Sequence, residues 1–466
     1  MQREAFRDDR MPGLYNSFSD GVQHGSLLFL SAMVGIDPST GRLLQSLSEV
    51  PDEQVQSFAL GRLAADSWGG PIQAQCWQLF RNIETILEGR GASLHDILRI
   101  NMWVKDFTLL PLLMPVRSHV FAPHSPPPIT NIGAVALCLP EAEIQVDVVV
   151  AIDSDGHGRR LVQSETVSQL VGDYALGAQS GSLTFGVGMI AARNDTRSVV
   201  RTYSDLAGGG ANLASGSRLG DEVEGGIRSQ THFILDDLFS VLDDIGSSGS
   251  RVALVRVYMK DTGEYAGWED VYLAAFPDAV PPTSVIPCTE LGIRHFRLEI
   301  ETISVDGNGD APECVTTPTL PAMVKAAASL SRAEGLIFIP GQYGIDANTG
   351  QLVSPTRSHA GDIAGLSTGS LLAQRHEGPV TVQTARIFQN LSHALEELGS
   401  GLADVLALYL YVTDAMYIPI VERVAGHFFE VDPPACSIVV VPQMPLKGAV
   451  VQIEAVAADT QRPPKG

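Results

Sequence analysis

Three polar side chains occupy the same place in three similar apolar segments. Glu299 lies in LEIETISV, and Gln145 and Gln452 take its place in IQVDVVVAI and VVQIEAVA. A carboxylate partly withdrawn from water beside an interface can hold or deprotonate a water molecule, which an amide cannot do. Glu299 is therefore a candidate general base. The alternative is a surface acid that alternates with Leu298 and Ile300 on a strand.

A Pro-rich turn precedes each of these segments, and the residues after it differ. PPTS contains Thr283 and Ser284, whose hydroxyls could bind a substrate carboxylate or carbonyl, or could cap backbone groups of their own turn. PPACS contains Cys436. Its thiolate could attack an electrophilic carbon if a neighbour lowered its pKa, and the alternative is a small, half-buried apolar side chain.

Three further side chains are candidates for lining a cleft. Gln342 in PGQY and Tyr174 before a strand could contact a ligand, although an aromatic residue at a strand start also fits a core position. Arg294 lies in GIRHFRLE beside Glu299. It could anchor an anion, or it could belong to a solvated hairpin.

The segment around Glu299 contains a second recurring acid. Asp147, Glu301 and Glu454 occupy one position in all three copies. This regularity favours a shared structural role, such as hydrogen bonds between domains, over catalysis.

One pattern of spacing recurs three times and must position these residues. A Gln that opens an amphipathic helix is followed by a Gly 16 positions later, by an Asp 15 positions after that, and by a Phe after another 15. Identical spacing in three places predicts three tandem copies of one domain. The sets are Gln75, Gly91, Asp106 and Phe121; Gln230, Gly246, Asp261 and Phe276; and Gln383, Gly399, Asp414 and Phe429.

Hydrophobic periodicity assigns the elements of each copy. Apolar residues recur at helical intervals through 72–87, and the glycine that follows closes the helix. Residues 98–105 then alternate as a strand does when one face lies on a core. The predicted order is ββαβαββ, an α+β domain, with long, lid-like inserts before each first helix. Linkers rich in Asp, Gly and Pro predict domains at 1–157, 158–311 and 312–466.

Composition limits the classes of function. The chain has 466 residues, of which 45% are hydrophobic and 18% charged, so it can bury substantial cores. A formal charge of −22 without any basic run disfavours nucleic-acid binding. No apolar run has secretory or membrane-spanning length, and five scattered cysteines show no metal-binding or disulfide spacing. We expect a cytoplasmic protein with free thiols and no metal.

With these motifs, the repeat resembles the RidA/YjgF reactive-intermediate deaminases. The third copy is nearest, with PGQYGIDANTG, VTD at 412–414, PPACS at 433–437 and QIEAVA at 452–457. The resemblance implies an intramolecular pseudo-trimer in which three sheets meet in a central barrel, helices lie outside and a cleft lies at each junction. It also implies hydrolysis of enamines and imines to keto acids and ammonia without a metal or an organic cofactor.

The three copies differ in which of the functional residues implied by the resemblance they keep. They are an arginine that binds the substrate carboxylate with its planar fork, a glutamate that positions water, and a tyrosine in the cleft. No copy keeps the arginine, and only the second keeps both other residues, so we expect one principal cleft. The arginine slots hold Ile129, Thr283 and Cys436; the glutamate slots hold Gln145, Glu299 and Gln452; and the tyrosine slots hold Phe18, Tyr174 and Ala327.

Three hypotheses of function follow. The first is a hydrolase of C–N bonds that acts on a small polar metabolite at Glu299 and Tyr174. The second, motivated by the missing arginine, is a non-catalytic scaffold that binds a ligand or a protein. The third is an amide or ring hydrolase that depends on Cys436. We expect a monomer, or a dimer of pseudo-trimers, because fusion already satisfies the faces of a trimer.

Overall fold

The structure is a computed structural model that describes most of the chain. It describes residues 3–58, 70–122, 125–152, 158–164, 167, 175–193, 196, 198–207, 210, 213, 225–292, 294–355 and 378–462. Tyr174, residues 153–157 of the first predicted linker, and much of each long insert lie outside these residues. Within the described part, no helix is long and apolar enough to span a membrane.

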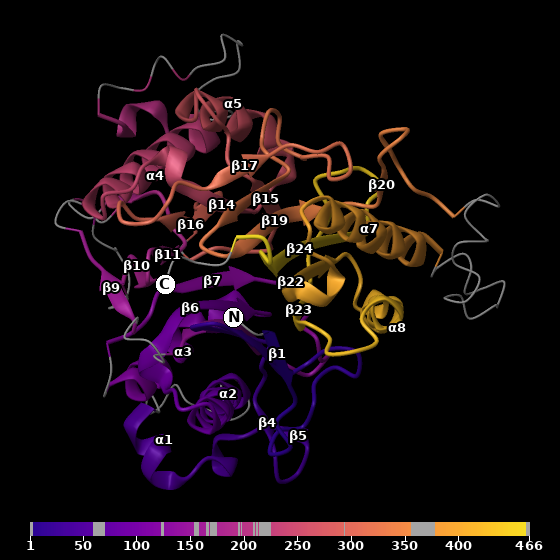
Figure 1. Cartoon of the computed structure of the whole chain (residues 1–466). Coiled ribbons are helices and arrows are strands. Elements are labelled where there is room, and N and C mark those ends of the chain that lie inside the picture. The colour runs from indigo at the N-terminus through magenta and orange to yellow at the C-terminus, as the bar shows by residue number, and fades with distance from the viewer. Residues whose placement is uncertain are drawn as a thin grey trace.

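The main strands form three six-stranded sheets with one common order (Figure 1). Neighbouring strands are antiparallel, except that the last pair of each sheet is parallel and is joined through a helix. In order from one edge of the sheet to the other, repeat 1 contains β1 (Arg3–Phe6), β2 (Gly21–His24), β3 (Leu27–Leu30), β8 (Ile144–Ala151), β6 (Ile97–Val104) and β7 (Ile129–Gly133). Repeat 2 contains β9 (Arg160–Val162), β10 (Gly177–Ser180), β11 (Leu183–Gly186), β16 (Leu298–Val305), β14 (Val252–Met259) and β15 (Thr283–Pro287). Repeat 3 contains β17 (Glu313–Val315), β18 (Leu330–Ala333), β19 (Leu336–Gln342), β24 (Val451–Ala458), β22 (Val405–Val412) and β23 (Ala435–Val440).

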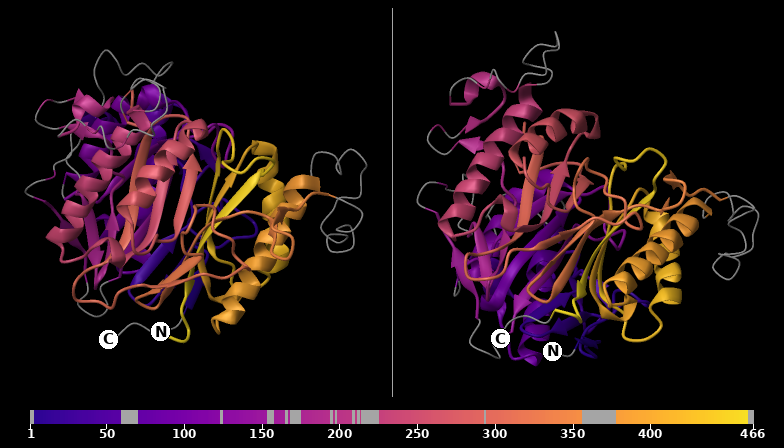
Figure 2. Two further views of the ribbon diagram at one scale, coloured as in Figure 1. Left: turned by 90° about the horizontal axis from the view of Figure 1, so that it is seen from above. Right: turned by 45° about the horizontal axis from the view of Figure 1, so that its top comes forward.

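Two helices cover the outer face of each sheet, as the turned views show (Figure 2). A small two-stranded hairpin precedes the first helix of each repeat. The helices are α2 (Gly70–Gly89) and α3 (Leu110–Phe121), α4 (Gly226–Asp244) and α5 (Tyr265–Ala275), and α7 (Gly378–Glu397) and α8 (Ile418–Phe428), with a short α1 (Asp52–Phe58) beside α3. The hairpins are β4 (Ile36–Asp37) with β5 (Arg42–Leu43), β12 (Ala192–Arg193) with β13 (Ser198–Val199), and β20 (Ile345–Asp346) with β21 (Gln351–Leu352).

The predicted ββαβαββ order is confirmed in every repeat, with two corrections. Each sheet has an additional edge strand (β1, β9 or β17), which is only three or four residues long and leaves little periodic signal. Each first helix begins about one turn before its Gln, at Gly70, Gly226 or Gly378. The apolar stripe already includes Ile72, so it was the choice of the Gln as the first helical residue that placed the start too late.

The recurring Gln is a structural residue whose side chain fixes the segment before the last strand. Oε1 of Gln75 accepts a hydrogen bond from the Glu143 backbone at 2.8 Å, and Oε1 of Gln230 accepts one from the Arg297 backbone at 2.8 Å. Gln383 does the same for Val450. These side chains are buried, so each amide satisfies backbone groups that water cannot reach.

The recurring Gly and Asp have equally local roles. Gly91, Gly246 and Gly399 have φ of 71°, 66° and 77°, the left-handed conformation that ends a helix at least steric cost. Asp106 and its counterparts accept a hydrogen bond from the backbone two residues later, which caps the turn before the second helix. The exact spacing of the motif is therefore the spacing of helix ends and caps.

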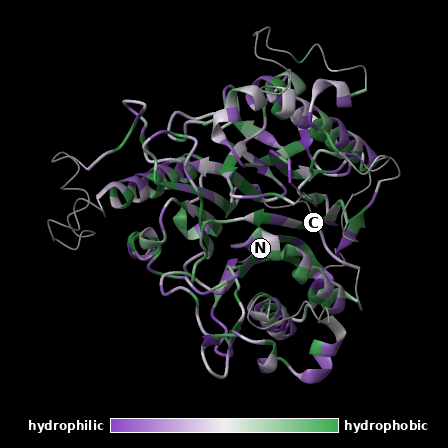
Figure 3. Cartoon of the chain, turned by 180° about the vertical axis from the view of Figure 1, so that it is seen from behind, coloured by the Kyte–Doolittle hydropathy of each residue, from purple (hydrophilic) through white to green (hydrophobic). Residues whose placement is uncertain are grey.

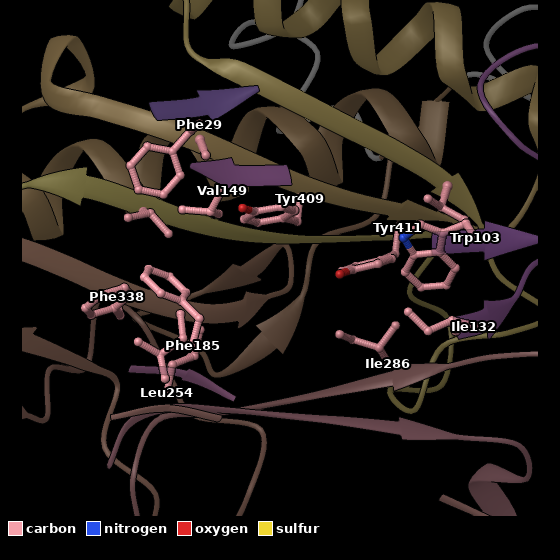
Figure 4. Close-up of a cluster of buried hydrophobic side chains, with 14 of the residues drawn as sticks. Phe29, Trp103, Ile132, Val149, Phe185, Leu254, Ile286, Phe338, Tyr409 and Tyr411 are labelled. Carbon is pink, nitrogen blue, oxygen red and sulfur yellow. The ribbon is translucent and has the colours of Figure 1, made fainter. Parts of the chain in front are cut away.

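Among the described residues, buried hydrophobic side chains form four clusters. Three clusters lie mainly between one sheet and its own helices. The fourth joins the inner faces of all three sheets (Figure 4). The central strands accordingly carry many hydrophobic residues, while hydrophilic residues are frequent on the outer helices (Figure 3). Matching positions in this shared core include Phe29, Phe185 and Phe338, and also Trp103, Tyr258 and Tyr411.

The shared core corrects the prediction that 98–105 has one buried face. Every residue of β6, β14 and β22 is buried. The face that appears polar in the sequence meets the neighbouring repeats: the Trp103 ring lies 5.9 Å from the rings of both Tyr258 and Tyr411. The three repeats therefore pack against one another around these residues and are not independent domains joined only by linkers.

The contacts between repeats follow a cycle. β6 of repeat 1 contacts β10 and β11 of repeat 2; β14 and β15 contact β18 and β19 of repeat 3; and β22 and β23 return to β2 and β3 of repeat 1. We call these interfaces seam 1–2, seam 2–3 and seam 3–1. Each seam joins the parallel strand pair of one repeat to the opening strands of the next.

Candidate functional site

Strand register places one polar residue at the same point of each seam. Gln145, Glu299 and Gln452 are the second residues of β8, β16 and β24, and each lies opposite an aromatic residue of the adjacent strand. All three side chains are buried. Their neighbours differ, so the three seams offer different chemistry.

Glu299 lies at seam 1–2, in contact with residues from two repeats. Its carboxyl occupies the space beside Gly188, where an added Cβ would overlap both Oε1 of Glu299 and Cγ2 of Thr130. The Gly188 backbone N–H donates to Oγ1 of Thr130 at 2.9 Å. The carboxyl is therefore held where β7 of repeat 1 meets the segment after β11 of repeat 2.

The environment of Glu299 changes its acidity. Burial raises the pKa of its carboxyl to about 8, and the nearby Glu301 carboxylate adds to the rise. Only 5% of the residue is exposed. A carboxyl with this pKa gains and loses a proton near neutral pH, so it can act as an acid or as a base. The amides of Gln145 and Gln452 cannot do either.

Arg117 is a buried charged residue of repeat 1 that the sequence did not single out. It lies in α3, is 5% exposed, and donates from Nη1 to Oδ1 of Asn131 in β7 at 2.9 Å. Asn131 directly follows Thr130, which touches Glu299. A buried guanidinium therefore lies against one face of β7, and Thr130 touches Glu299 from the opposite face of this strand. Comparing the position 11 residues after each recurring Asp would have found it, because Tyr272 and Ala425 stand there in the other repeats.

Thr283, Ser284 and Gln342 lie together at seam 2–3, away from Glu299. The Thr283 hydroxyl contacts the Tyr272 hydroxyl at 2.8 Å and donates to Pro281 O at 2.8 Å. The Ser284 hydroxyl donates to Glu454 at 2.7 Å and accepts from the backbone N–H of Gly341 at 2.8 Å. Both hydroxyls are thus engaged inside the protein.

Gln342 is similarly engaged within its own segment. Its Nε2 donates to the backbone oxygen of Pro340 at 3.0 Å, and the residue is buried. Ala327, at the tyrosine slot of this seam, is also buried and packs in the core of repeat 2.

Seam 3–1 is filled by side chains of repeat 1. The rings of Tyr15 and Phe18 meet edge to face with centroids 5.7 Å apart, and both pack in one cluster with Cys436. Burial raises the pKa of the Cys436 thiol well above its ordinary value. A thiol that resists ionisation is a weak nucleophile. All five cysteines are free, as the spacing predicted.

The two remaining sequence candidates are Arg294 and Tyr174. Arg294 is exposed in the turn before β16, next to His295, which has a φ of 87°. Arg297 of the same turn forms an ion pair with Glu264. Tyr174 lies outside the described residues. The predicted set is therefore divided, with Glu299, the Thr283 group and Cys436 at three different seams.

A network of buried ion pairs links the three repeats. Arg99 contacts Asp147 at 2.8 Å and Glu301 of repeat 2 at 3.2 Å. Arg256 contacts Glu301 at 2.6 Å and also pairs with Glu454 of repeat 3. Glu301 and Glu454 thus form the inter-repeat contacts that their regularity predicted, whereas Asp147 pairs with Arg99 of its own repeat.

The network holds fewer cations than acids. Two guanidiniums face three carboxylates, and burial raises the pKa of Asp147 to about 6 despite the adjacent Arg99. Glu301 of this network is the acid that adds to the rise in the pKa of Glu299. The central contacts between repeats therefore influence the acidity of the candidate site.

Comparison with known proteins agrees with the repeat. A family model described as Endoribonuclease L-PSP matches three times, at residues 10–152, 205–306 and 359–459. A 2-iminobutanoate/2-iminopropanoate deaminase from Dermatophagoides farinae is 23% identical over 29% of this chain and 86% of its own length. A RutC family protein from Pyrococcus abyssi is 26% identical over 27% of this chain and 80% of its own length.

Solved structures are similar to this chain over one repeat or over most of its length. RidA from the Antarctic bacterium Psychrobacter is 23% identical and covers 31% of this chain and 98% of its own, with a TM-score of 0.25. A chorismatase structure is 14% identical and covers 78% of this chain and 93% of its own, with a TM-score of 0.46. The three family matches together span most of the chain. The chain therefore belongs to the RidA/YjgF family, whose model is described as Endoribonuclease L-PSP, and carries three copies of its domain.

Proposed function

We propose that seam 1–2 hydrolyses the C–N bond of a small imine or enamine, and that Glu299 moves the protons. The observation that carries this proposal is a buried carboxyl with a pKa of about 8 at one seam, where the other two seams carry amides. A relative named for deaminating 2-iminobutanoate and 2-iminopropanoate supports the choice of reaction.

The reaction needs one group that first accepts and then returns a proton. The Glu299 carboxylate takes a proton from water as the water oxygen bonds to the imine carbon. The resulting carboxylic acid returns this proton to the nitrogen, which gives a carbinolamine. Glu299 then takes the proton of the carbinolamine hydroxyl and passes it to the nitrogen as the C–N bond breaks, so that a keto product and ammonia leave. A pKa near the working pH suits both steps, because neither form of the acid is too stable.

Arg117 supplies the second element of the proposed site. The strand slot where the resemblance implies an arginine holds Ile129, which is buried in the core of repeat 1. Arg117 reaches the same strand from helix α3 through Asn131. We assign to it the attraction of an anionic group on the substrate, since a guanidinium keeps its charge when buried.

The alternative hypotheses gain less from the geometry. The Cys436 thiol is buried, is surrounded by side chains of two repeats, and has a raised pKa. A scaffold without catalysis would gain nothing from a buried, ionisable carboxyl at one seam, whereas glutamine, present at the other two, would be less costly to bury. We also propose that the chain works as a monomeric pseudo-trimer, because the three seams close within it.

The test uses 2-iminopropanoate generated in place from an amino acid. Ammonia release above the rate without protein should rise with pH toward a plateau above about 8, and Glu299→Gln should remove the increase. Cys436→Ala at seam 3–1 is the matched control and should retain activity. Equal rates for wild type and Glu299→Gln would exclude the proposal, and loss of activity only in Cys436→Ala would favour the thiol.

A further inference from the structure

Both buried guanidiniums of the ionic network meet at one of its three acids. Nη1 of Arg99 and Nη1 of Arg256 each donate to Oε1 of Glu301, at 3.2 and 2.6 Å. In the described part of the chain, Asp147 pairs with Arg99 alone and Glu454 with Arg256 alone. Glu301 therefore receives more positive charge than either of its counterparts.

The second oxygen of Glu301 is also held by donors. Oε2 accepts from the hydroxyl of Thr130 at 3.2 Å and from the hydroxyl of Tyr258 at 3.4 Å. The residue is 1% exposed, so these contacts replace the water that an exposed carboxylate would have. A guanidinium donates hydrogen bonds and cannot accept them, so this set of partners fits the carboxylate form of Glu301.

Glu301 lies beside Glu299 on one face of β16. The two residues are two positions apart and lie opposite Arg256 and Tyr258 of β14, so both face the inside of the three sheets. The residue between them, Ile300, packs in the outer cluster of repeat 2. The charge of Glu301 therefore faces the same side of the sheet as the carboxyl of Glu299.

The other repeats lack this pair of acids. Asp147 and Glu454 each follow a glutamine at the same two-residue spacing. A neutral amide gains or loses no proton, so the charge of these two acids has no ionisable neighbour to influence at that position. The acid that both guanidiniums contact is thus the one that lies beside an ionisable residue.

The other titratable groups around Glu299 are neutral or paired. Burial raises the pKa of both Tyr258 and Cys288 well above the ordinary values, and the charge of Glu299 adds to the rise for Cys288. Lys260 and Arg297, which follow β14 and precede β16, are each paired with an acid. Glu301 is therefore the main charged neighbour of Glu299 among the described residues.

We propose that Glu301 is a positioning residue for the reaction at seam 1–2: its carboxylate, held by both guanidiniums, makes the adjacent Glu299 carboxylate a stronger base. This inference rests on the function proposed above for Glu299. Two like charges in one buried site resist ionising together, so Glu299 holds its proton more tightly beside a charged Glu301.

The sign of the effect is fixed by the composition of the network. Neutralising Glu301 removes a negative charge next to Glu299. It also leaves Arg99 and Arg256 with fewer carboxylates, and the excess positive charge favours an ionised Glu299 as well. Both consequences lower the affinity of Glu299 for its proton.

Glu301→Gln tests the proposal through the pH profile of ammonia release from 2-iminopropanoate. The midpoint should move from about 8 to lower pH by about one unit or more. The plateau rate should fall, because a weaker base removes a proton from water more slowly. The variant should therefore be faster than the wild type at about pH 6 and slower at about pH 9. A purely structural defect would lower the rate at every pH and leave the midpoint in place.

Glu454→Gln is the matched control. It also removes an acid that Arg256 contacts, but at seam 2–3, where the neighbouring position holds an amide. It should shift the midpoint by less than about half as much as Glu301→Gln does, because its charge lies farther from Glu299. Equal midpoints for both variants and the wild type would overturn the proposal.

Infrared titration separates this proposal from the proposed function, because it needs no substrate. The carboxylic acid band that is absent from Glu299→Gln should disappear at lower pH in Glu301→Gln than in the wild type. If Glu301→Gln does not fold, Arg99→Gln should move the band to higher pH, since it removes a positive charge and keeps Glu301. An unmoved band in the folded variants overturns the role of Glu301, whatever the activity. A moved band in a protein that releases no ammonia keeps the electrostatic coupling and excludes the proposed function instead.

Discussion

The carboxyl of Glu299 and the backbone of Gly188 share a space that has no room for a side chain on residue 188. A Cβ at this position would overlap Oε1 of Glu299. Gly341 has the same relation to Gln452 at seam 2–3, while seam 3–1 has Ala32 at this place and turns Gln145 toward Cys138 and Ile438. The methyl group of Ala32 is thus accompanied by a different orientation of the Gln145 side chain.

Gly188→Ala should displace the Glu299 carboxyl and lower the proposed deaminase activity by ~100-fold, the scale of lost proton transfer. The repeat 1 alanine shows that the fold accepts a Cβ here, so the variant should remain folded. Gly341→Ala is the control and should leave ammonia release unchanged. Full activity in Gly188→Ala would mean that the position of Glu299 does not matter for the reaction.

Glu299 should also make stability depend on pH. Its folded pKa of about 8 lies above the ordinary glutamate value of ~4.3, so the folded chain keeps a proton that the unfolded chain has lost. Between these values the free energy of unfolding falls as pH rises, by up to ~1.4 kcal/mol per pH unit. The stabilisation is complete below the unfolded pKa and is lost as pH passes 8.

Glu299→Gln should remove this slope. Denaturant unfolding at pH 5 and pH 8 should show a smaller difference for the variant than for the wild type, and the variant should be the more stable protein at pH 8. Gln452→Glu should introduce a slope at seam 2–3. Parallel pH profiles for wild type and Glu299→Gln would show that the carboxyl titrates as it does in water.

Local spacing was enough to predict the repeat and its elements. The Gln, Gly and Asp at fixed intervals are a backbone clamp, a helix end and a cap, and each acts within its own repeat. The pattern left open whether Glu299 lies beside an interface or on the surface, and the structure buries it. The domain boundaries at 157 and 311 stay predictions.

The contacts between repeats could not be predicted from that pattern. The cycle of seams arises from contacts between residues more than 50 positions apart, such as Thr130 with Gly188 and Glu301 on one side and Ser284 with Glu454 on another. Arg117 was missed for a related reason. A single arginine in LPLLMPVRSHVF has the pattern of a solvent-facing helix residue, and only the position of β7 shows that it is buried.

Arg256→Met tests whether the ionic network holds the repeats together. The substitution leaves Glu454 and Glu301 buried with fewer partners, which should cost about 3–5 kcal/mol of unfolding free energy. Denaturant unfolding would measure it. Arg10→Met, which removes an exposed pair with Asp8, should have no measurable effect. Equal stability of the two variants would show that the network contributes nothing to the assembly.

Arg117 should control substrate affinity more than the chemical step. If its guanidinium attracts an anionic substrate group, Arg117→Met should raise KM for 2-iminopropanoate by ~10-fold or more with a smaller change in kcat, whereas Glu299→Gln should act mainly on kcat. Arg117→Lys should recover part of the affinity, because a lysine keeps the charge but loses the planar fork. An uncharged imine should be hydrolysed equally by wild type and Arg117→Met. If Arg117→Met instead lowers kcat for charged and uncharged substrates alike, the residue positions β7 through Asn131 and does not bind the substrate.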